Sequence, residues 1–150
     1  MTARLTRALV LLSGGLDSSV LLHAVRRRLG PAGALHVLSF DYGQKHAREL
    51  DLAREQAARA RAASHRVVPL PFFPDLIAGG SALTDAAIPV PALAALTPAQ
   101  RVQPPTYVPN RNLILLALAA AAAEAAGVAD LFYGAQAQDR YGYWDCTPAF

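Results

Sequence analysis

A run of serine and glycine residues near the amino terminus has the composition of a phosphate-binding turn. It reads Ser13-Gly14-Gly15-Leu16-Asp17-Ser18-Ser19, between an apolar run at 8–12 and a segment of helical periodicity at 16–29. Glycine allows positive φ and a close approach of backbone to an anion, and the helix start offers unpaired N–H groups. We therefore expect the turn to bind phosphate. A turn in which Asp17 or Ser18 only caps the helix is the alternative.

Two common nucleotide-binding motifs do not match this run. The Gly-Lys-Ser/Thr ending of a Walker loop is absent, and so is the Gly-x-Gly-x-x-Gly spacing of a Rossmann fingerprint. The sequence thus predicts a phosphate loop of another type.

The segments around the turn predict an α/β fold. Short apolar runs predict buried strands at 8–12, 34–40, 65–70 and 130–134, and helical spacing predicts helices at 16–29, 44–63 and 113–126. This alternation predicts one domain over residues 1–150, with an open parallel sheet and helices on both faces. The stretch 71–109, rich in Pro and Gly, predicts a long excursion, and 135–150 a polar and aromatic loop.

Polar residues follow the other expected strands or open the last helix. They are Asp41, Tyr42, Gln44, Lys45 and His46, then Arg111 and Asn112, then Asp139, Tyr143 and Asp145. Ligands of open α/β sheets bind at the carboxyl ends of the strands, so these residues are candidates for a site. A guanidinium such as that of Arg111 can clamp a phosphate. The alternatives are ordinary helix-start residues for Lys45 and His46, a solvated arginine for Arg111, and plain loop residues for Asp139, Tyr143 and Asp145.

Composition excludes several classes of protein. With 53% hydrophobic and 17% charged residues, the chain is globular rather than disordered. Its net charge of +3 comes mainly from arginines at 26–28 and 48–61, without interleaved aromatics, which favours solvated helix faces over a nucleic-acid surface. The single cysteine, Cys146, excludes an internal disulfide and indicates a reducing compartment. Without a membrane-length apolar run or a signal peptide, we expect a cytoplasmic protein.

The motif Ser-Gly-Gly-x-Asp-Ser after a strand resembles the phosphate loop of PP-loop ATP pyrophosphatases, which have an adenine nucleotide alpha hydrolase-like fold. Four further segments extend the resemblance, at 39–46, 80–84, 107–112 and 142–146. They read Ser-Phe-Asp-Tyr-Gly-Gln-Lys-His, Gly-Ser-Ala-Leu-Thr, Tyr-Val-Pro-Asn-Arg-Asn and Gly-Tyr-Trp-Asp-Cys. Over nearly its whole length the chain thus resembles the 7-cyano-7-deazaguanine synthase family.

This resemblance implies a ligase that converts 7-carboxy-7-deazaguanine, ammonia and ATP to 7-cyano-7-deazaguanine, a precursor of queuosine in transfer RNA. It implies an adenylated intermediate, Mg²⁺ as a counter-charge and a homodimer, with small-molecule partners and no direct contact to nucleic acid or membrane. Another PP-loop ligase that adenylates a different carboxylate is one alternative. An inactive nucleotide-binding fragment is another, and an RNA-binding protein is a weaker one.

The resemblance also assigns roles to residues. It places the catalytic role on Asp17, Ser18 and Arg111. It places substrate binding on Gln44, Lys45, His46, Asn112, Asp139, Tyr143 and Asp145. It places ATP binding on Leu12, Ser13, Gly14, Gly15, Leu16, Asp17, Ser18, Ser19, Val20, Leu21 and Leu22, with Asp41 and Tyr42.

Two features depart from the family pattern. The family carries a C-terminal segment with a four-cysteine Zn²⁺ site, whereas this sequence ends at Phe150, so we expect a truncated member with an exposed sheet edge. The substrate loop has Arg140-Tyr141 before Gly142, Trp144 where the family usually has proline, and Thr147 where it usually has arginine. ATP binding is therefore the firmer expectation, and base recognition the weaker one.

Overall fold

The computed structural model describes residues 5–44, 48–85, 87–136, 139 and 142–150. Its strands are β1 (Arg7–Leu11), β2 (Ala34–Asp41), β3 (Ser64–Pro69) and β4 (Leu131–Phe132). Its helices are α1 (Leu16–Leu29), α2 (Arg48–Arg59), α3 (Phe73–Leu76), α4 (Pro98–Val102) and α5 (Arg111–Ala125), with short 3-10 turns η1 (Leu93–Ala95) and η3 (Trp144–Cys146).

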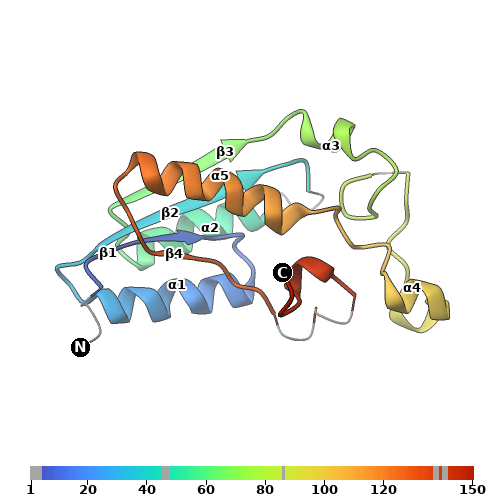
Figure 1. The fold of residues 1–150 in the computed structure, drawn as a ribbon, viewed down its shortest axis with the longest axis horizontal. Coiled ribbons are helices and arrows are strands. Elements are labelled where there is room, and N and C mark those ends of the chain that lie inside the picture. The colour runs from blue at the N-terminus through green and yellow to red at the C-terminus, as the bar shows by residue number, and fades with distance from the viewer. Residues whose placement is uncertain (1–4, 45–47, 86, 137–138, 140–141) are drawn as a thin grey trace.

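The strands form a parallel sheet in the order β3-β2-β1-β4 (Figure 1). The register runs from Arg7↔Ala34 to Leu11↔Leu38 between β1 and β2, and from His36↔Ser64 to Asp41↔Pro69 between β2 and β3. The chain moves outward from β1 to β3 and then returns to place β4 on the other side of β1. The direction of winding therefore reverses between β1 and β4, the place where such sheets bind ligands.

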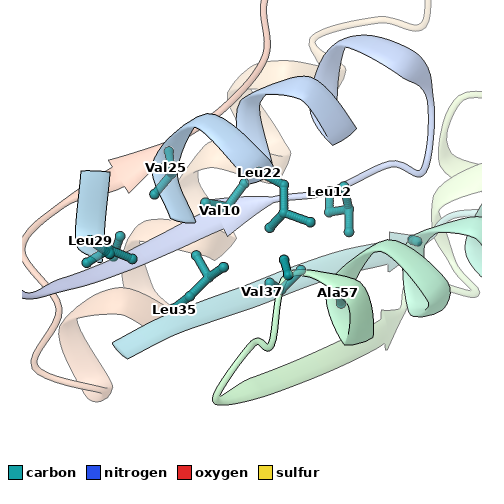
Figure 2. Packing of buried hydrophobic residues seen from close by; sticks show 11 residues of the cluster. Val10, Leu12, Leu22, Val25, Leu29, Leu35, Val37 and Ala57 are labelled. Atoms are coloured by element: carbon teal, nitrogen blue, oxygen red, sulfur yellow. The ribbon is translucent and has the colours of Figure 1, made fainter. Parts of the chain in front are cut away.

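Helices cover both faces of this sheet, as predicted. On one face, α1 and α2 pack on β1 and β2 through a buried cluster that includes Val10, Leu22, Val25 and Leu35 (Figure 2). On the other face lies α5, whose Ala119 and Ala123 join a second cluster of the sheet's opposite side. Burying one such aliphatic side chain stabilises a fold by about 1.5–3 kcal/mol, so the two clusters hold the layers together.

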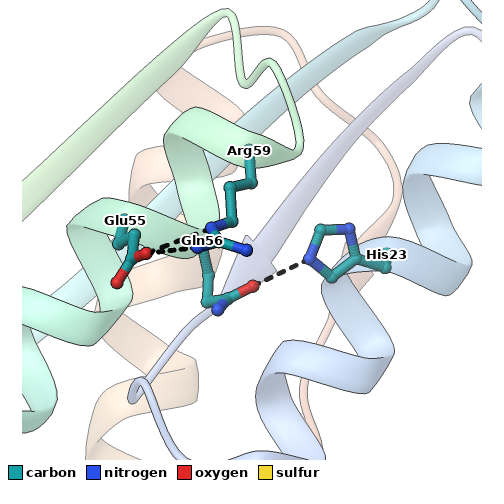
Figure 3. Close-up of polar contacts among 4 residues, drawn as sticks. All are labelled: His23, Glu55, Gln56 and Arg59. Carbon is teal, nitrogen blue, oxygen red and sulfur yellow. Dashed lines mark hydrogen bonds and ion pairs between the residues drawn. The ribbon is translucent and has the colours of Figure 1, made fainter.

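The arginine-rich helix α2 makes exposed polar contacts, which fits the solvated face predicted for it. The side chain of His23 in α1 meets Gln56 at 2.9 Å, and Arg59 pairs with Glu55 at 2.6 Å (Figure 3). Exposed ion pairs of this kind contribute only about 0–1 kcal/mol. These contacts on the surface of α1 and α2 thus contribute little to the stability of the fold.

Two predicted elements are longer than the observed ones. The helix predicted at 44–63 is α2, from Arg48 to Arg59, and Gln44 lies in the preceding loop with its amide donating to the Phe40 carbonyl at 3.2 Å. The helix stops because Arg61 has a φ of 50°, and the Ala62 N–H turns back to the Ala57 carbonyl at 3.0 Å. The strand predicted at 130–134 pairs only over β4, because the chain then turns toward the start of α1.

The predicted excursion and the last loop both lie beyond the carboxyl ends of the strands (Figure 1). The excursion at 71–109 is less irregular than expected, since it contains α3, η1 and α4, and α4 begins at a capping box between Thr97 and Gln100. The loop at 135–150 contains η3. In the described part of the chain, no helix combines the length and apolarity needed to cross a membrane.

Candidate functional site

The serine–glycine run forms a compact turn between β1 and α1, held together by Ser18. The Ser18 hydroxyl accepts from the Ser13 N–H at 3.3 Å, lies 2.9 Å from the Ser13 hydroxyl and donates to the Gly15 carbonyl at 3.1 Å. Ser18 is only 8% exposed, whereas Asp17 is exposed. The two predicted catalytic residues of this turn thus have different surroundings.

Glycine is required at position 14 of this turn. Gly14 has a φ of 92°, and a Cβ there would lie 2.0 Å from the Glu49 carbonyl oxygen in α2. Gly15 is the N-cap of α1 and gives that helix no side-chain cap. The simple capping alternative therefore finds no support at the N-cap, and the first turn of α1 keeps N–H groups for an anion.

A cavity of about 220 Å³ opens beside the turn at the carboxyl edge of the sheet. Its lining includes Ser13, Ser18, Tyr42, Gln44, Arg111 and Tyr133. Ligand pockets usually measure about 300–1,000 Å³, so this cavity can enclose part of a nucleotide. Sequence segments from the first strand to the last thus meet at one place.

Arg111 opens α5 on the side of the cavity opposite the turn. Its Nη1 lies 3.5 Å from the Tyr42 hydroxyl. Burial by itself lowers the pKa of Arg111, but Tyr42 first and then Asp145 and Cys146 raise that pKa above its usual value. The guanidinium therefore stays cationic at any physiological pH and can face an anion in the cavity.

Asp145, near the carboxyl end of the chain, caps the first turn of α5. Its carboxylate accepts from the backbone N–H of Asn112 at 3.0 Å, and the Asn112 amide donates to the Asp145 carbonyl at 3.3 Å. Asp145 is 3% exposed. Asn112 and Asp145, both predicted to bind substrate, are thus hydrogen-bonded to each other.

The carboxyl of Asp139 and the thiol of Cys146, which both interact with Arg111, have raised pKa values. Burial raises the pKa of Asp139, Arg111 opposes that rise, and Asp17 and Asp145 add to it. Burial, Asp145 and Asp139 likewise raise the pKa of Cys146, although Arg111 and Asn112 oppose the rise. A thiol that resists ionisation is a poor nucleophile, so the site gives Cys146 no nucleophilic role.

A family model described as queuosine biosynthesis protein QueC matches residues 7–150. The chain belongs to the QueC family. It is 52% identical over 150 residues to the 7-cyano-7-deazaguanine synthase of Anaeromyxobacter dehalogenans (strain 2CP-C), covering 99% of this chain and 61% of that protein. It is 50% identical over 143 residues to the synthase of Thiobacillus denitrificans, covering 95% and 59%. The chain thus spans about three fifths of the length of these curated relatives.

Two solved structures share the fold of this QueC family chain. An NH3-dependent NAD synthetase from Campylobacter jejuni superposes with a TM-score of 0.50 over 85% of this chain and 46% of its own. The U34-tRNA thiolase NcsA from Methanococcus maripaludis gives 0.53 over 87% and 38%. At 13% sequence identity each, these likenesses concern the fold alone, and they agree with the predicted parallel α/β sheet with helices.

The structure places the other predicted residues of the QueC motifs in different surroundings. Leu12 and Leu22 lie in the core, while Leu16 is 78% and Val20 61% exposed. Tyr143 stacks on the Tyr107 ring, and its hydroxyl lies 2.6 Å from that of Thr106. Ser19 donates to the Gly15 carbonyl at 2.8 Å, Leu21 packs against the core, and Asp41 accepts from Gly43 at 3.5 Å. Lys45 and His46 lie outside the described residues.

Sequence reasoning missed several residues of this site. Tyr133 and Gly134 line the cavity just after β4, and Glu49 lines it from the first turn of α2. Ser39 also lines it, at the buried end of β2. Ser39 belongs to the motif at 39–46, and Tyr133 and Gly134 are the last two residues of the strand predicted at 130–134, so position at a strand's carboxyl end was the available signal.

Proposed function

We propose that this chain carries the ATP-binding part of a 7-cyano-7-deazaguanine synthase. Such an enzyme is an ATP-dependent ligase that converts 7-carboxy-7-deazaguanine and ammonia to 7-cyano-7-deazaguanine in queuosine biosynthesis. The observation that carries the proposal is the cavity that Ser13 and Ser18 of the turn line together with Arg111, in a chain of the QueC family.

The proposed reaction begins by activating a carboxylate, which is a poor electrophile. A carboxylate oxygen attacks the α-phosphorus of ATP, and pyrophosphate leaves. Ammonia then attacks the acyl carbon and gives up a proton, and AMP leaves with its electron pair to give the amide. A second ATP activates the amide oxygen with loss of pyrophosphate, and departure of AMP together with the two protons of the nitrogen gives the nitrile. Each transfer builds negative charge at phosphorus and on the leaving group, which the protein must stabilise.

The described residues supply suitable groups for that task. The N-terminus of α1 and the turn around Gly14 and Gly15 offer N–H groups to the phosphates. Ser18 holds the turn in shape. Arg111 is the cation opposite the turn, and we assign it to the charge that develops on the departing pyrophosphate. The carboxylate of Asp17 is exposed in the first turn of α1, where it can orient the bound phosphates through a cation.

Mg²⁺ fits this site only as a partner of the nucleotide. Within the described ranges, no three His, Cys, Asp or Glu side chains come together as a metal site. Protein sites for Mg²⁺ commonly use one or two carboxylates, with phosphates and water as the other ligands. Asp17, which is exposed in the first turn of α1, is the carboxylate that would hold it, and the ion would supply counter-charge to the phosphates.

Recognition of the deazaguanine base is the finer part of the proposal. Gln44 and Asn112 line the cavity, and Asp139 and Asp145 interact electrostatically with Arg111, whereas Lys45 and His46 stay predictions. Asp139 is a candidate partner for ring N–H groups, since its carboxyl is partly exposed and not tied to α5 as Asp145 is. A homodimer and a cytoplasmic location also stay predictions. Light scattering would test the homodimer.

The deciding experiment measures AMP and pyrophosphate released from ATP by the purified chain, with and without 7-carboxy-7-deazaguanine and ammonium. We expect release that depends on the carboxylate. Asp17→Asn and Arg111→Lys should each lower the rate by about 100-fold, since each alters a group that faces the reacting phosphates. Arg59→Lys, in an exposed ion pair on α2, is the matched control and should keep the rate.

The other outcomes separate the alternatives. ATP binding without any turnover would mark an inactive nucleotide-binding fragment. Turnover that another carboxylate supports, while 7-carboxy-7-deazaguanine does not, would mark a related PP-loop ligase with a different substrate.

A further inference from the structure

A buried serine hydroxyl links β2 both to β3 and to the residue at which β1 leads into the phosphate turn. Ser39, at the carboxyl end of β2, is 1% exposed. Its Oγ donates to the Leu12 carbonyl at 2.6 Å and lies 2.9 Å from Nε2 of His65 in β3. The catalytic groups assigned above include neither Ser39 nor His65.

The chemistry of a hydroxyl sets the direction of both hydrogen bonds. A serine hydroxyl has one proton, and a carbonyl oxygen can only accept, so the proton of Ser39 goes to Leu12. His65 must therefore donate from Nε2, and Ser39 must accept. The chain of donors runs in one direction, from His65 through Ser39 to Leu12.

The receiving carbonyl belongs to the peptide unit that begins the turn. Because a peptide unit is planar, the direction of the Leu12 carbonyl also fixes the direction of the Ser13 N–H, on the opposite side of the same plane. Ser39 holds the oxygen end of this plane, and Ser18 accepts from its N–H end at 3.3 Å. The Leu12 N–H is also held, by the Leu38 carbonyl at 2.9 Å. The direction in which the turn leaves β1 thus depends on Ser39.

The state of His65 agrees with its role as a donor. Burial lowers its pKa below the usual value, and the charge of Arg54 lowers it further. The ring is therefore neutral at neutral pH and carries a single proton, which the bond to Ser39 assigns to Nε2.

We propose that His65 is a positioning residue for the phosphate turn: by donating to Ser39, it directs the Ser39 hydroxyl onto the Leu12 carbonyl and so orients the Leu12–Ser13 peptide. Its effect on ATP rests on the proposed function, whereas its effect on the shape of the turn does not. His65 touches no reacting group, so the test needs readouts that follow the geometry of the turn.

The first test follows the Ser13 amide by hydrogen exchange in NMR, without any ligand. His65→Phe removes the donor and keeps a flat ring, and we expect the Ser13 amide to exchange about tenfold faster or more. His65→Gln keeps an N–H near the position of Nε2, and its exchange should stay within about threefold of wild type. The Leu9 amide, bonded to the Asp130 carbonyl at 2.9 Å, reports that the sheet is intact.

Ser39 variants guard against a folding failure of His65→Phe. Ser39→Ala removes the same link, while Ser39→Thr keeps the hydroxyl on a residue that suits a strand. Ser39→Ala should speed Ser13 exchange as His65→Phe does, and the double variant should add little, because both changes break one chain of bonds. Unchanged Ser13 exchange in both single variants would overturn the proposal. Equally fast Ser13 exchange in His65→Gln and His65→Phe would also overturn it, since the donated N–H would then make no difference.

The second test titrates ATP with Mg²⁺ by calorimetry. We expect His65→Phe to raise the Kd for ATP about tenfold, the equivalent of one displaced phosphate contact, and His65→Gln to stay near wild type. Fast Ser13 exchange with an unchanged Kd would show that the turn's orientation does not serve ATP, which rejects the link to function. Wild-type binding of ATP without release of AMP would instead count against the proposed reaction and leave the positioning role in place.

Discussion

Gly14 and Gly15 stand next to each other in the phosphate turn but meet different steric demands. Gly14 has positive φ, and its missing Cβ leaves the space that the backbone of Glu49 and Ala53 approaches. Gly15 has a φ of −72°, and a Cβ there would meet only the Ser13 hydroxyl, at 3.5 Å. The two glycines therefore give a matched pair of substitutions.

Gly14→Ala should destabilise the protein by about 2–4 kcal/mol, because it adds both backbone strain and a clash with α2. Gly15→Ala should cost less than about 1 kcal/mol, as most tolerated substitutions do. Urea unfolding followed by circular dichroism measures both. Equal losses in the two variants would mean that the close contact between the turn and α2 does not exist in solution.

Helix α5 is an element whose start depends on residues far along the chain. Its sequence is apolar nearly all round, so its own pattern does not define which side meets the sheet. Asn110, its N-cap, has a φ of 51° and gives no side-chain cap. Asp145 supplies the missing acceptor from η3 by bonding the Asn112 N–H. The orientation of Arg111 in the cavity is thus tied to the last loop.

Asp145→Ala should lower the unfolding free energy by about 1–2 kcal/mol, since it removes a capping acceptor and leaves a buried N–H without it. Asp145→Asn keeps an oxygen acceptor and should lose less than half of that amount. Chemical denaturation with matched fits of the unfolding slope gives the comparison. An alanine variant as stable as wild type would show that the carboxylate does not cap α5.

For the whole molecule, a ligand that binds only the folded chain must raise its stability. At an ATP concentration of 100 times Kd, the gain is about 2.7 kcal/mol, which for a domain of this size raises Tm by about 5–10 °C. Adenosine lacks the phosphates that we propose the turn binds, so it should give a much smaller rise. A thermal melt with ATP, adenosine and buffer tests this directly. An equal rise with adenosine would place the binding energy outside the phosphate turn.

The fold was predictable from sequence wherever one local pattern decided the structure. The apolar runs of β1 and β2 and the periodic α1 are examples, because burial on two faces or on one helix stripe leaves a clear mark on residue types. The ends of elements were less predictable. The stop of α2 at a left-handed Arg61 has no mark in the sequence, since glycine or asparagine is usual at that position. The brevity of β4 depends on pairing, which local pattern does not contain.

The sequence by itself determined the family and predicted the phosphate turn, since the order of the motifs and the residue types of Ser13–Ser18 are local properties of the chain. Only the tertiary structure decided which residues face one another. It brought Arg111 to Tyr42, closed α5 with Asp145, and placed His65 against Ser39 beneath the turn. These contacts join residues between 26 and 69 positions apart. Their geometry depends on strand order and helix packing, which no local spacing encodes.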